Sequence, residues 1–364
     1  MNRRSPLACA VALAVCSVAV AAQGAADWQT GSVKLESAGP LAFAPDGVLL
    51  VSDPMAATIY AVATEDNSGD PSRVNVAVED VRGKIAAMLG TEAEGVRIND
   101  LAVNPASGNI YMSATRGSGP DSAAVIVRVD AEGQISDVPL DDVKYMQAKI
   151  PNPPQSQETR RGDPRMLTIT DMAFADGRIF IAGLSNEEFA SKLRSIPFPF
   201  DQVNEGTSVE IYHGAHGAIE TRSPIMTFAT YEIASEPHVV AAYTCTPLVK
   251  FPLGELKPGV KVRGTTVAEL GNRNRPLDMF VYEKDGKQYI LMANSSRGVM
   301  KITTEKIDSI EGIDERIEDT AGLPYDTIDE LSGVLQLDRL NDSHAVALIQ
   351  GDDGTESLRT IELP

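Results

Sequence analysis

The stretch "PLAFAPDGVLLVSDPMAATIYAVAT", from Pro40 to Thr64, reads as three short apolar strands joined by two tight connections. Asp46-Gly47 is a hairpin signal, because glycine supplies the positive φ that such turns need. The second connection, around Pro54, is polar enough to end one strand and begin the next. This stretch therefore predicts three consecutive antiparallel strands.

The same order of strand, turn, strand, loop and strand recurs along the chain. Clear copies begin at "DLAVNPASGNIYMSAT", "DMAFADGRIFIAGL" and "DMFVYEKDGKQYILMAN", and two weaker copies complete the series. Segments such as "SVEIYHG" and "VKVRGTTVAEL" provide a fourth strand per unit. The first apolar residues of the six copies are Leu41, Leu101, Met172, Ile225, Met279 and Val334. Four-stranded units repeated around an axis make a β-propeller.

We therefore predict an all-β chain that folds as a six-bladed β-propeller with four strands in each blade. Seven blades are the alternative, because the interval between Leu101 and Met172 is longer than the others. Its excess, "YMQAKIPNPPQSQETRRGDPRM" (residues 145–166), is predicted to be a surface loop. The last copy lacks an outer strand, which the N-terminal "WQTGSVKLES" (residues 28–37) is predicted to supply, closing the ring.

The first 25 residues have the features of a secretory signal. Arg3 and Arg4 precede an apolar run, and small residues follow at the spacing that a signal peptidase accepts. Residues 26–364 are then predicted to form a single propeller domain in the periplasm or outside the cell, and they include no stretch apolar enough to be a membrane span. Removing the leader changes the formal charge from −19 to −21, since it takes two arginines and no acids. Such an acidic chain excludes a basic nucleic-acid-binding face.

The segment "HGAHG" places His213 and His216 three apart, although the chain has only four histidines. It follows a fourth strand, and the loop with Tyr243 and Cys245 joins strands two and three of the next unit. In propellers both kinds of loop lie on the face around the channel mouth. Imidazole and thiolate are ligands of copper and zinc. We therefore predict a copper site formed by His213, His216 and Cys245, with Tyr243 and Cys245 as the catalytic candidates.

Cys245 has two other interpretations. Cys9 and Cys16 lie in the leader, so Cys245 is the one cysteine of the mature chain. It is then an inert buried thiol or the site of an intermolecular bridge, if it is not a ligand. A tyrosine joined to a cysteine by a thioether occurs with copper in some secreted propeller oxidases, which is a similarity of fold and residue type only.

Other polar residues are predicted to surround the same mouth. They occur just before first strands or between second and third strands, and an aspartate in three units is expected to tie neighbouring blades together. The candidates are Asn99, Asp100, Asp171, Asn186, Arg275, Asp278, Asn294 and Arg297.

The hairpin "GPLAFAPDGVLLVSD" resembles the strand hairpins of the secreted propeller superfamily that includes gluconolactonase-like and NHL-like proteins. Lactonase-like members hold one calcium ion at the mouth through Glu, Asn and Asp residues. That resemblance implies calcium as the alternative metal, with Asp100, Asp171, Asn186 and Asn294 as its ligands.

Three functions follow from these residues. The first is a copper-binding protein, with oxidoreductase activity as its extension. The second is a non-catalytic propeller that presents its mouth to a small molecule or a periplasmic protein, and the third is a calcium-dependent lactonase-like hydrolase.

Overall fold

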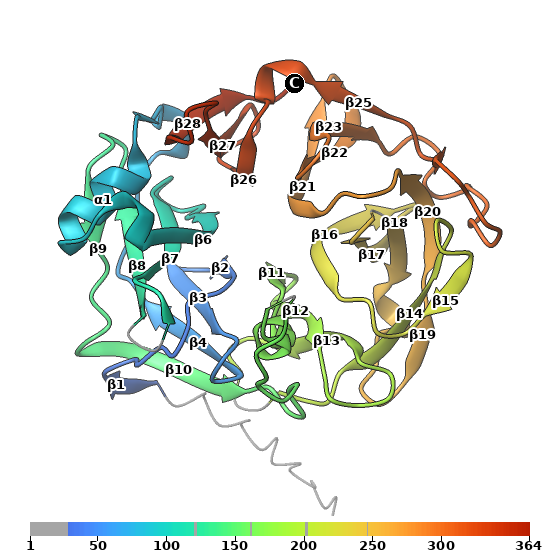
Figure 1. Cartoon of the computed structure of the whole chain (residues 1–364), viewed down its shortest axis with the longest axis horizontal. Helices are drawn as coiled ribbons and strands as arrows, with labels where there is room; N and C mark the ends of the chain where they lie inside the picture. The colour runs from blue at the N-terminus through green and yellow to red at the C-terminus, as the bar shows by residue number, and fades with distance from the viewer. Residues whose placement is uncertain (1–27, 120–121, 161, 201–202, 246) are drawn as a thin grey trace, which may run out of the picture.

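The chain forms six β-sheets arranged in a ring (Figure 1), and their strands pair antiparallel except for the added strand β19 (Lys261–Arg263), which pairs parallel to its neighbour. The computed structural model describes residues 28–119, 122–160, 162–200, 203–245 and 247–364. The predicted β-propeller and its six blades are thus confirmed, whereas the predicted leader lies outside the described residues. We number the blades by the order in which their inner strands occur in the chain.

The first three blades take most of their strands from the first 213 residues of the chain. Blade 1 consists of β2 (Leu41–Ala44), β3 (Val48–Asp53), β4 (Thr58–Ala63) and β10 (Val143–Lys149), with β1 (Gln29–Gly31) at its edge. Blade 2 consists of β6 (Val96–Val103), β7 (Ile110–Arg116), β8 (Ala123–Val129) and β9 (Ile135–Asp137). Blade 3 consists of β11 (Asp171–Ala175), β12 (Arg178–Leu184), β13 (Ser191–Pro197) and β14 (Thr207–His213), to which β15 (Ala218–Glu220) and β19 (Lys261–Arg263) add.

The other three blades complete the ring. Blade 4 consists of β16 (Ile225–Ile233), β17 (Glu236–Tyr243), β18 (Pro247–Pro252) and β20 (Thr265–Leu270), with β24 (Thr320–Gly322) at its edge. Blade 5 consists of β21 (Pro276–Lys284), β22 (Lys287–Asn294), β23 (Gly298–Thr303) and β25 (Tyr325–Ile328). Blade 6 consists of β26 (Val334–Arg339), β27 (His344–Gln350), β28 (Glu356–Glu362) and β5 (Ala77–Val78).

Helices are few and short. The α-helix α1 spans Val81–Leu89, and 3₁₀ turns occur at Pro71–Arg73, Ala93–Gly95, Pro164–Thr168, Leu253–Glu255 and Asp329–Leu331. Within the described ranges, none of these helices has the length and apolar character needed to span a membrane.

Each blade is covered by a neighbour on both faces, which explains its continuous apolar strands. All six residues of β3 are buried. Leu49 and Val51 pack toward blade 2, whereas Leu50 packs on the other face toward blade 3. A strand with two buried faces has no need of polar alternation.

The blades do not follow one another around the ring in chain order. Contacts between inner strands give the order 2, 1, 3, 4, 5, 6 and back to 2. The reason is β10, which comes after blade 2 in the chain but pairs with β4 of blade 1. Most of β10 falls in the segment predicted to be a surface loop, and only the part of that segment after Lys149 lies outside strands.

The predicted closure by residues 28–37 is wrong. β1 pairs with β10 in blade 1, and Val33 donates its backbone N–H to Leu140, so this segment does not reach blade 6. The missing outer strand is β5, which pairs with β28 through Ala77 and Val78. The physical reason lies in "VNVAV" (residues 74–78), where Val74, Val76 and Val78 alternate with exposed residues.

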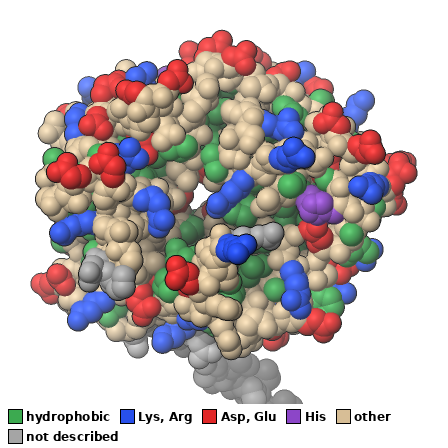
Figure 2. All heavy atoms as spheres, in the orientation of Figure 1, with side chains coloured by type: hydrophobic (Ala, Val, Ile, Leu, Met, Phe, Trp, Pro, Cys, Tyr) green, Lys and Arg blue, Asp and Glu red, His purple; other side chains and the backbone are tan. Residues whose placement is uncertain are grey.

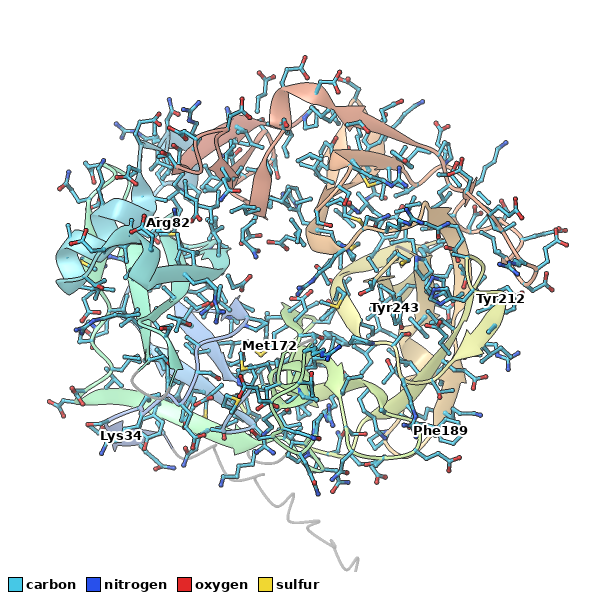
Figure 3. All side chains as sticks on the ribbon, viewed as in Figure 1. Lys34, Arg82, Met172, Phe189, Tyr212 and Tyr243 are labelled. Atoms are coloured by element: carbon cyan, nitrogen blue, oxygen red, sulfur yellow. The ribbon has the colours of Figure 1, made fainter. Side chains whose placement is uncertain are left out.

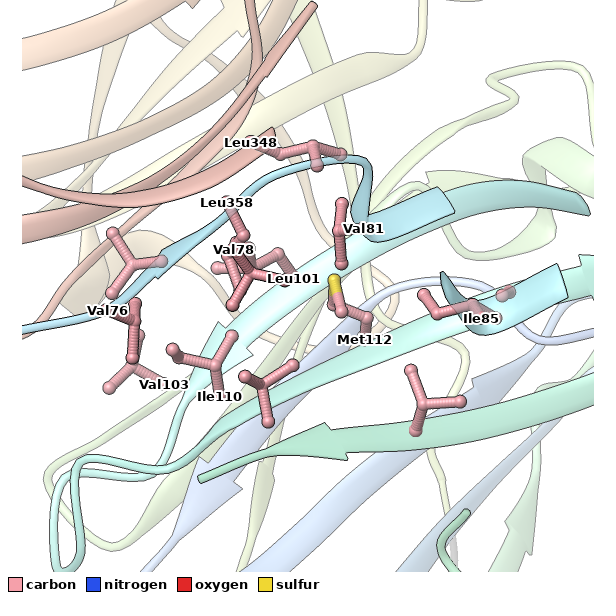
Figure 4. Close-up of a cluster of buried hydrophobic side chains, with 14 of the residues drawn as sticks. Val76, Val78, Val81, Ile85, Leu101, Val103, Ile110, Met112, Leu348 and Leu358 are labelled. Atoms are coloured by element: carbon pink, nitrogen blue, oxygen red, sulfur yellow. The ribbon is translucent and has the colours of Figure 1, made fainter. Parts of the chain in front are cut away.

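Those three valines are buried between blades 6 and 2, in one cluster with Leu348 and Leu358. Figure 4 shows Val76 and Val78 beside side chains of blade 6, with α1 and blade 2 on the other side. The chain thus returns to the end of the ring after its first four strands, and β5 closes it.

Four aspartates connect neighbouring blades around the centre, as predicted for three of them. Asp100 accepts the backbone N–H of Leu41, Asp171 that of Phe228, and Asp278 that of Leu337. Each acceptor belongs to one blade and each donor to the next blade's inner strand. The fourth, Asp338, accepts the N–H of Val103 and was not predicted.

Candidate metal site

A hairpin at the end of blade 3 brings His213, His216 and Glu220 together. β14 ends at His213, and the turn returns through backbone bonds from His216 N and Gly217 N to the carbonyl of His213. Gly217 has φ +63°, a conformation that glycine adopts without strain. β15 then pairs with β14, with Glu220 opposite Ile211.

The three side chains form a compact donor set. His216 Nδ1 lies 2.5 Å from Glu220 Oε1, and His213 Nδ1 lies 3.1 Å from the same oxygen. The imidazole centroids are 3.9 Å apart. One donor atom from each of the three residues lies within 4.8 Å of the others. This separation is small enough for one metal ion to bind all three after modest side-chain rotation.

Burial differs sharply across this set. The His213 side chain is 2% exposed and Glu220 is 20% exposed, whereas His216 is 54% exposed. Among the described residues, His213 Nε2 has no hydrogen-bond partner, and Nδ1 faces the Glu220 carboxylate at 3.1 Å. Buried polar atoms without a partner are rare and often mark an absent ion or water.

Glu220 is held in its anionic form. Burial alone would raise the pKa of Glu220, but the adjacent imidazoles of His213 and His216 and the hydroxyl of Ser223 outweigh burial and lower it to about 2. Since metal binding requires a deprotonated carboxylate, this residue is prepared to act as a ligand at neutral pH.

Blade 4 covers the buried side of the cluster. Glu269 of β20 is 1% exposed and accepts the N–H of Gly214 at 2.5 Å, while its Oε2 has no hydrogen-bond partner in the described chain. Burial raises the pKa of Glu269, although the Gly214 N–H and the charges of His213 and His216 oppose this. By accepting the N–H of Gly214, the Glu269 carboxylate fixes the backbone of the turn that carries both histidines.

Tyr243 lies on the same side, at the end of β17. It is 1% exposed, and its hydroxyl makes no hydrogen bond of good geometry within the described chain. Burial raises the pKa of Tyr243, and the nearby charge of Glu220 raises it further, while Ser191 opposes both. Figure 3 shows Tyr243 nearer the centre of the ring than Tyr212, the residue before His213. Tyr243 therefore lies behind the cluster and is kept neutral.

Cys245 does not join the donor set. It lies in the turn after β17 with φ +62°, is partly exposed, and donates its N–H to the carbonyl of Asn274. Its sulfur is not within 4.8 Å of all three donors, and the third member of the cluster is Glu220.

Glu220 and Glu269 were both missed from the sequence. Glu220 occurs four residues after His216, whereas no local pattern points to Glu269.

The other two histidines lie near the starts of second strands. His238 is in β17, and its Nδ1 is 2.8 Å from the carbonyl of Glu236. His344 is the first residue of β27. Neither belongs to the cluster.

The cluster also lies away from the channel. A central cavity of about 430 Å³ is lined by the inner strands, and its walls include none of His213, His216, Tyr243 or Cys245. Figure 2 shows an opening near the centre of the ring, and a histidine beside acidic side chains farther out on the same face. The metal candidates therefore belong to the seam between blades 3 and 4.

Only three of the eight further mouth candidates line this cavity: Asp100, Asp171 and Asp278. The others stabilise loops. Asn99 donates to the Ala38 carbonyl, and Asn294 donates to Asn274 Oδ1. Backbone groups of Asn186 and Arg275 bond to Asn152 and Ser295, and Arg297 donates to the Asn272 carbonyl at 3.4 Å. The calcium set of Asp100, Asp171, Asn186 and Asn294 is thus divided between the cavity and these loops.

The four cavity aspartates predict a pH dependence of stability. Burial raises the pKa of Asp171 to about 7 and that of Asp338 to about 6, and it also raises the pKa values of Asp100 and Asp278. The folded state then binds more protons than the unfolded state between pH 5 and 8. The free energy of unfolding is therefore expected to fall as the pH rises through this window.

Asp171→Asn should reduce that pH dependence, because it removes one titrating carboxyl. The substitution also weakens the bond from Phe228 N–H, so the variant should be less stable by about 1 kcal/mol where Asp171 is protonated. Urea unfolding at several pH values between 5 and 8 measures both effects. Equal slopes for the wild type and the variant would contradict the raised pKa.

No protein-family model matches this chain, and no curated protein matches it. Solved structures do show similarity. A PQQ-bound aldose sugar dehydrogenase from Streptomyces coelicolor is 14% identical, with 93% of this chain and 99% of that chain covered and a TM-score of 0.36. A GH43 endo-arabinanase from Bacillus licheniformis is 13% identical, with 73% and 94% covered and a TM-score of 0.37. The extracellular region of plexin A4 is 10% identical, with 90% and 34% covered and a TM-score of 0.41. Similarity at this level does not identify an activity.

Proposed function

We propose that this propeller binds one divalent transition-metal ion, with copper as the best candidate, through His213, His216 and Glu220. The observation that supports the proposal most is His213, a buried imidazole whose Nε2 has no hydrogen-bond partner among the described residues and which lies beside a second imidazole and a carboxylate. A metal ion would satisfy a nitrogen that water does not reach.

The donor chemistry favours copper over calcium. Imidazole suits Cu, Zn, Fe and Ni, whereas calcium requires oxygen ligands. Among divalent first-row metals, Cu²⁺ generally binds a given nitrogen and oxygen site most tightly. Two imidazoles and one carboxylate suit Cu²⁺ in a tetragonal arrangement, and they do not provide the thiolate of a blue-copper site.

Three protein ligands leave coordination positions open, which an oxidoreductase acting on a small molecule requires. The exposed His216 gives such a molecule access to the site. The supporting groups are Glu269, which holds the turn, and Tyr243, which lies behind the ligands as a neutral phenol. The leader-like residues 1–25 further support export, so we place this function in the periplasm.

Metal titration tests the proposal directly. Apo protein titrated with Cu²⁺ is expected to bind one equivalent, with an electron paramagnetic resonance signal that shows coupling to two nitrogens. Zn²⁺ should bind more weakly at the same site. Absence of stoichiometric binding by any of Cu²⁺, Zn²⁺, Ni²⁺ or Fe²⁺ would overturn the proposal.

The variants Cys245→Ser and Glu220→Gln distinguish the two sets of ligands. Because the sulfur lies outside the cluster, Cys245→Ser should change the Cu²⁺ dissociation constant by less than about threefold. Glu220→Gln removes the anionic ligand and should weaken binding by about tenfold or more. Isothermal titration calorimetry against a competing chelator measures both. If Cys245→Ser weakened Cu²⁺ binding more than Glu220→Gln, the third ligand would be the Cys245 thiol and not the Glu220 carboxylate.

A further inference from the structure

Strand β13 carries two cationic side chains into the seam between blades 3 and 1. Lys192 and Arg194 are two residues apart and therefore point to the same face of the strand. Ile196 continues this face and packs with Met146 and Ile150 at the outer strand of blade 1. Lys192 is 2% exposed and Arg194 is fully buried. Buried cations in this position need anionic or carbonyl partners.

Lys192 has such partners. Its Nζ lies 2.5 Å from Glu187 Oε2 and donates to Ser208 Oγ at 2.9 Å. The other oxygen of Glu187 accepts from Asn152 Nδ2 at 2.8 Å. The carboxylate of Glu187 is thus engaged by both Lys192 and Asn152.

Arg194 is poorly satisfied by comparison. Its Nη2 reaches the carbonyl of Pro151 only at 3.5 Å. Its Nε and Nη1 are buried and have no hydrogen-bond partner among the described residues. Burial lowers the pKa of Arg194 to about 10 against the opposing charge of Glu187, so the guanidinium still carries its charge at neutral pH.

The backbone is adapted to hold this side chain in place. Gly206 has φ +77°, and a Cβ at that position would lie 2.5 Å from Arg194 Cγ. Because Gly206 has no Cβ, the Arg194 side chain can pack directly against the backbone at this position. A buried charge with two nitrogens that lack partners among the described residues is costly unless a partner compensates it.

We propose that Arg194 is the centre of a binding site for a small oxyanion at the seam between blades 3 and 1. A guanidinium offers several N–H donors in a plane, which matches the oxygens of a carboxylate or sulfate. Among the described residues these two cations share the carboxylate of Glu187, so one further negative charge would balance the seam. This site shares no residue with the metal site, so each can fail without the other.

Thermal unfolding in a zwitterionic buffer tests the site, with sodium acetate, sodium sulfate and sodium chloride compared at equal ionic strength. The wild-type midpoint is expected to rise and saturate with acetate or sulfate, because a ligand that binds only the folded state stabilises it. Acetate alone indicates a carboxylate site, and sulfate alone indicates an inorganic oxyanion site. Calorimetric titration of the wild type with the active anion should give one binding site per chain.

Arg194→Gln should abolish the saturating rise, and Arg194→Lys should weaken it at least tenfold, since lysine lacks the planar fork. Arg359→Gln is the matched control, because Arg359 is an exposed arginine paired with Glu79 in blade 6. Sulfate stabilises most proteins by exclusion from their surface, an effect that all variants should share and that does not saturate.

If the wild type and Arg194→Gln respond identically to every anion, the site does not exist. Loss of stability in Arg194→Gln without any saturating anion effect in the wild type would also overturn it, because the guanidinium would then be satisfied within the chain. Where Arg194→Gln fails to fold, Arg194→Lys and the wild-type calorimetry still decide the question.

Discussion

Replacing His213 with alanine is expected to weaken Cu²⁺ binding by about a hundredfold or more. Loss of an outer-shell partner typically costs 10–100-fold in metal affinity, and loss of a ligand should cost at least as much. The effect should be largest at His213, because its nitrogens are buried and its ring is fixed by packing at the end of β14. His216 is half exposed and can be replaced in part by water, so His216→Ala should cost less.

His238→Ala is the matched control for this loss. His238 is also a mostly buried histidine on a strand, but it lies at the start of β17 and outside the cluster. Its substitution should leave Cu²⁺ affinity unchanged even if it lowers the melting temperature. Circular dichroism establishes that each variant is folded before titration with Cu²⁺ against a chelator. Equal losses from His213→Ala and His238→Ala would mean that copper does not bind at the hairpin.

The repeat architecture could be predicted because its signals are local. Asp46-Gly47 and its counterparts mark hairpins, and the aspartates before the first strands recur at fixed positions. Closure could not be predicted in the same way, since it depends on which segment finds the free edge of β28. The alternating valines at positions 74, 76 and 78 were the available signal. Both this segment and residues 28–37 could pair with the free edge of β28 as far as the sequence shows. The burial of the three valines distinguishes them, and it is seen only in the folded ring.

The site, like the fold, was predictable only where its signals are local in the sequence. "HGAHG" identified both histidines, but Glu220 became a candidate only when β15 folded back on β14. The histidines predicted to surround the channel mouth do not line the central cavity, for a geometric reason. A fourth strand is near the outer edge of its blade, so residues just after it stay outside. The channel is lined mainly by residues of the first strands, and the only predicted candidates among these lining residues are Asp100, Asp171 and Asp278. Glu269 approaches Gly214 from 55 residues away, and no local pattern encodes that contact.

Val78→Asp is expected to lower the free energy of unfolding by about 3–4 kcal/mol, because it places a carboxylate in the apolar cluster that closes the ring. Val78 is 2% exposed and lies opposite Leu358 in the ladder between β5 and β28. Ala77→Asp is the control, since Ala77 belongs to the same short strand, points to solvent and lies opposite Arg359. It keeps the backbone pairing and adds a favourable charge pair across the strands, so its effect should stay within about 0.5 kcal/mol. Urea unfolding measures both variants, and hydrogen exchange should show faster exchange of β28 amides in Val78→Asp alone. If both variants lost the same stability, β5 would not be the strand that closes the ring.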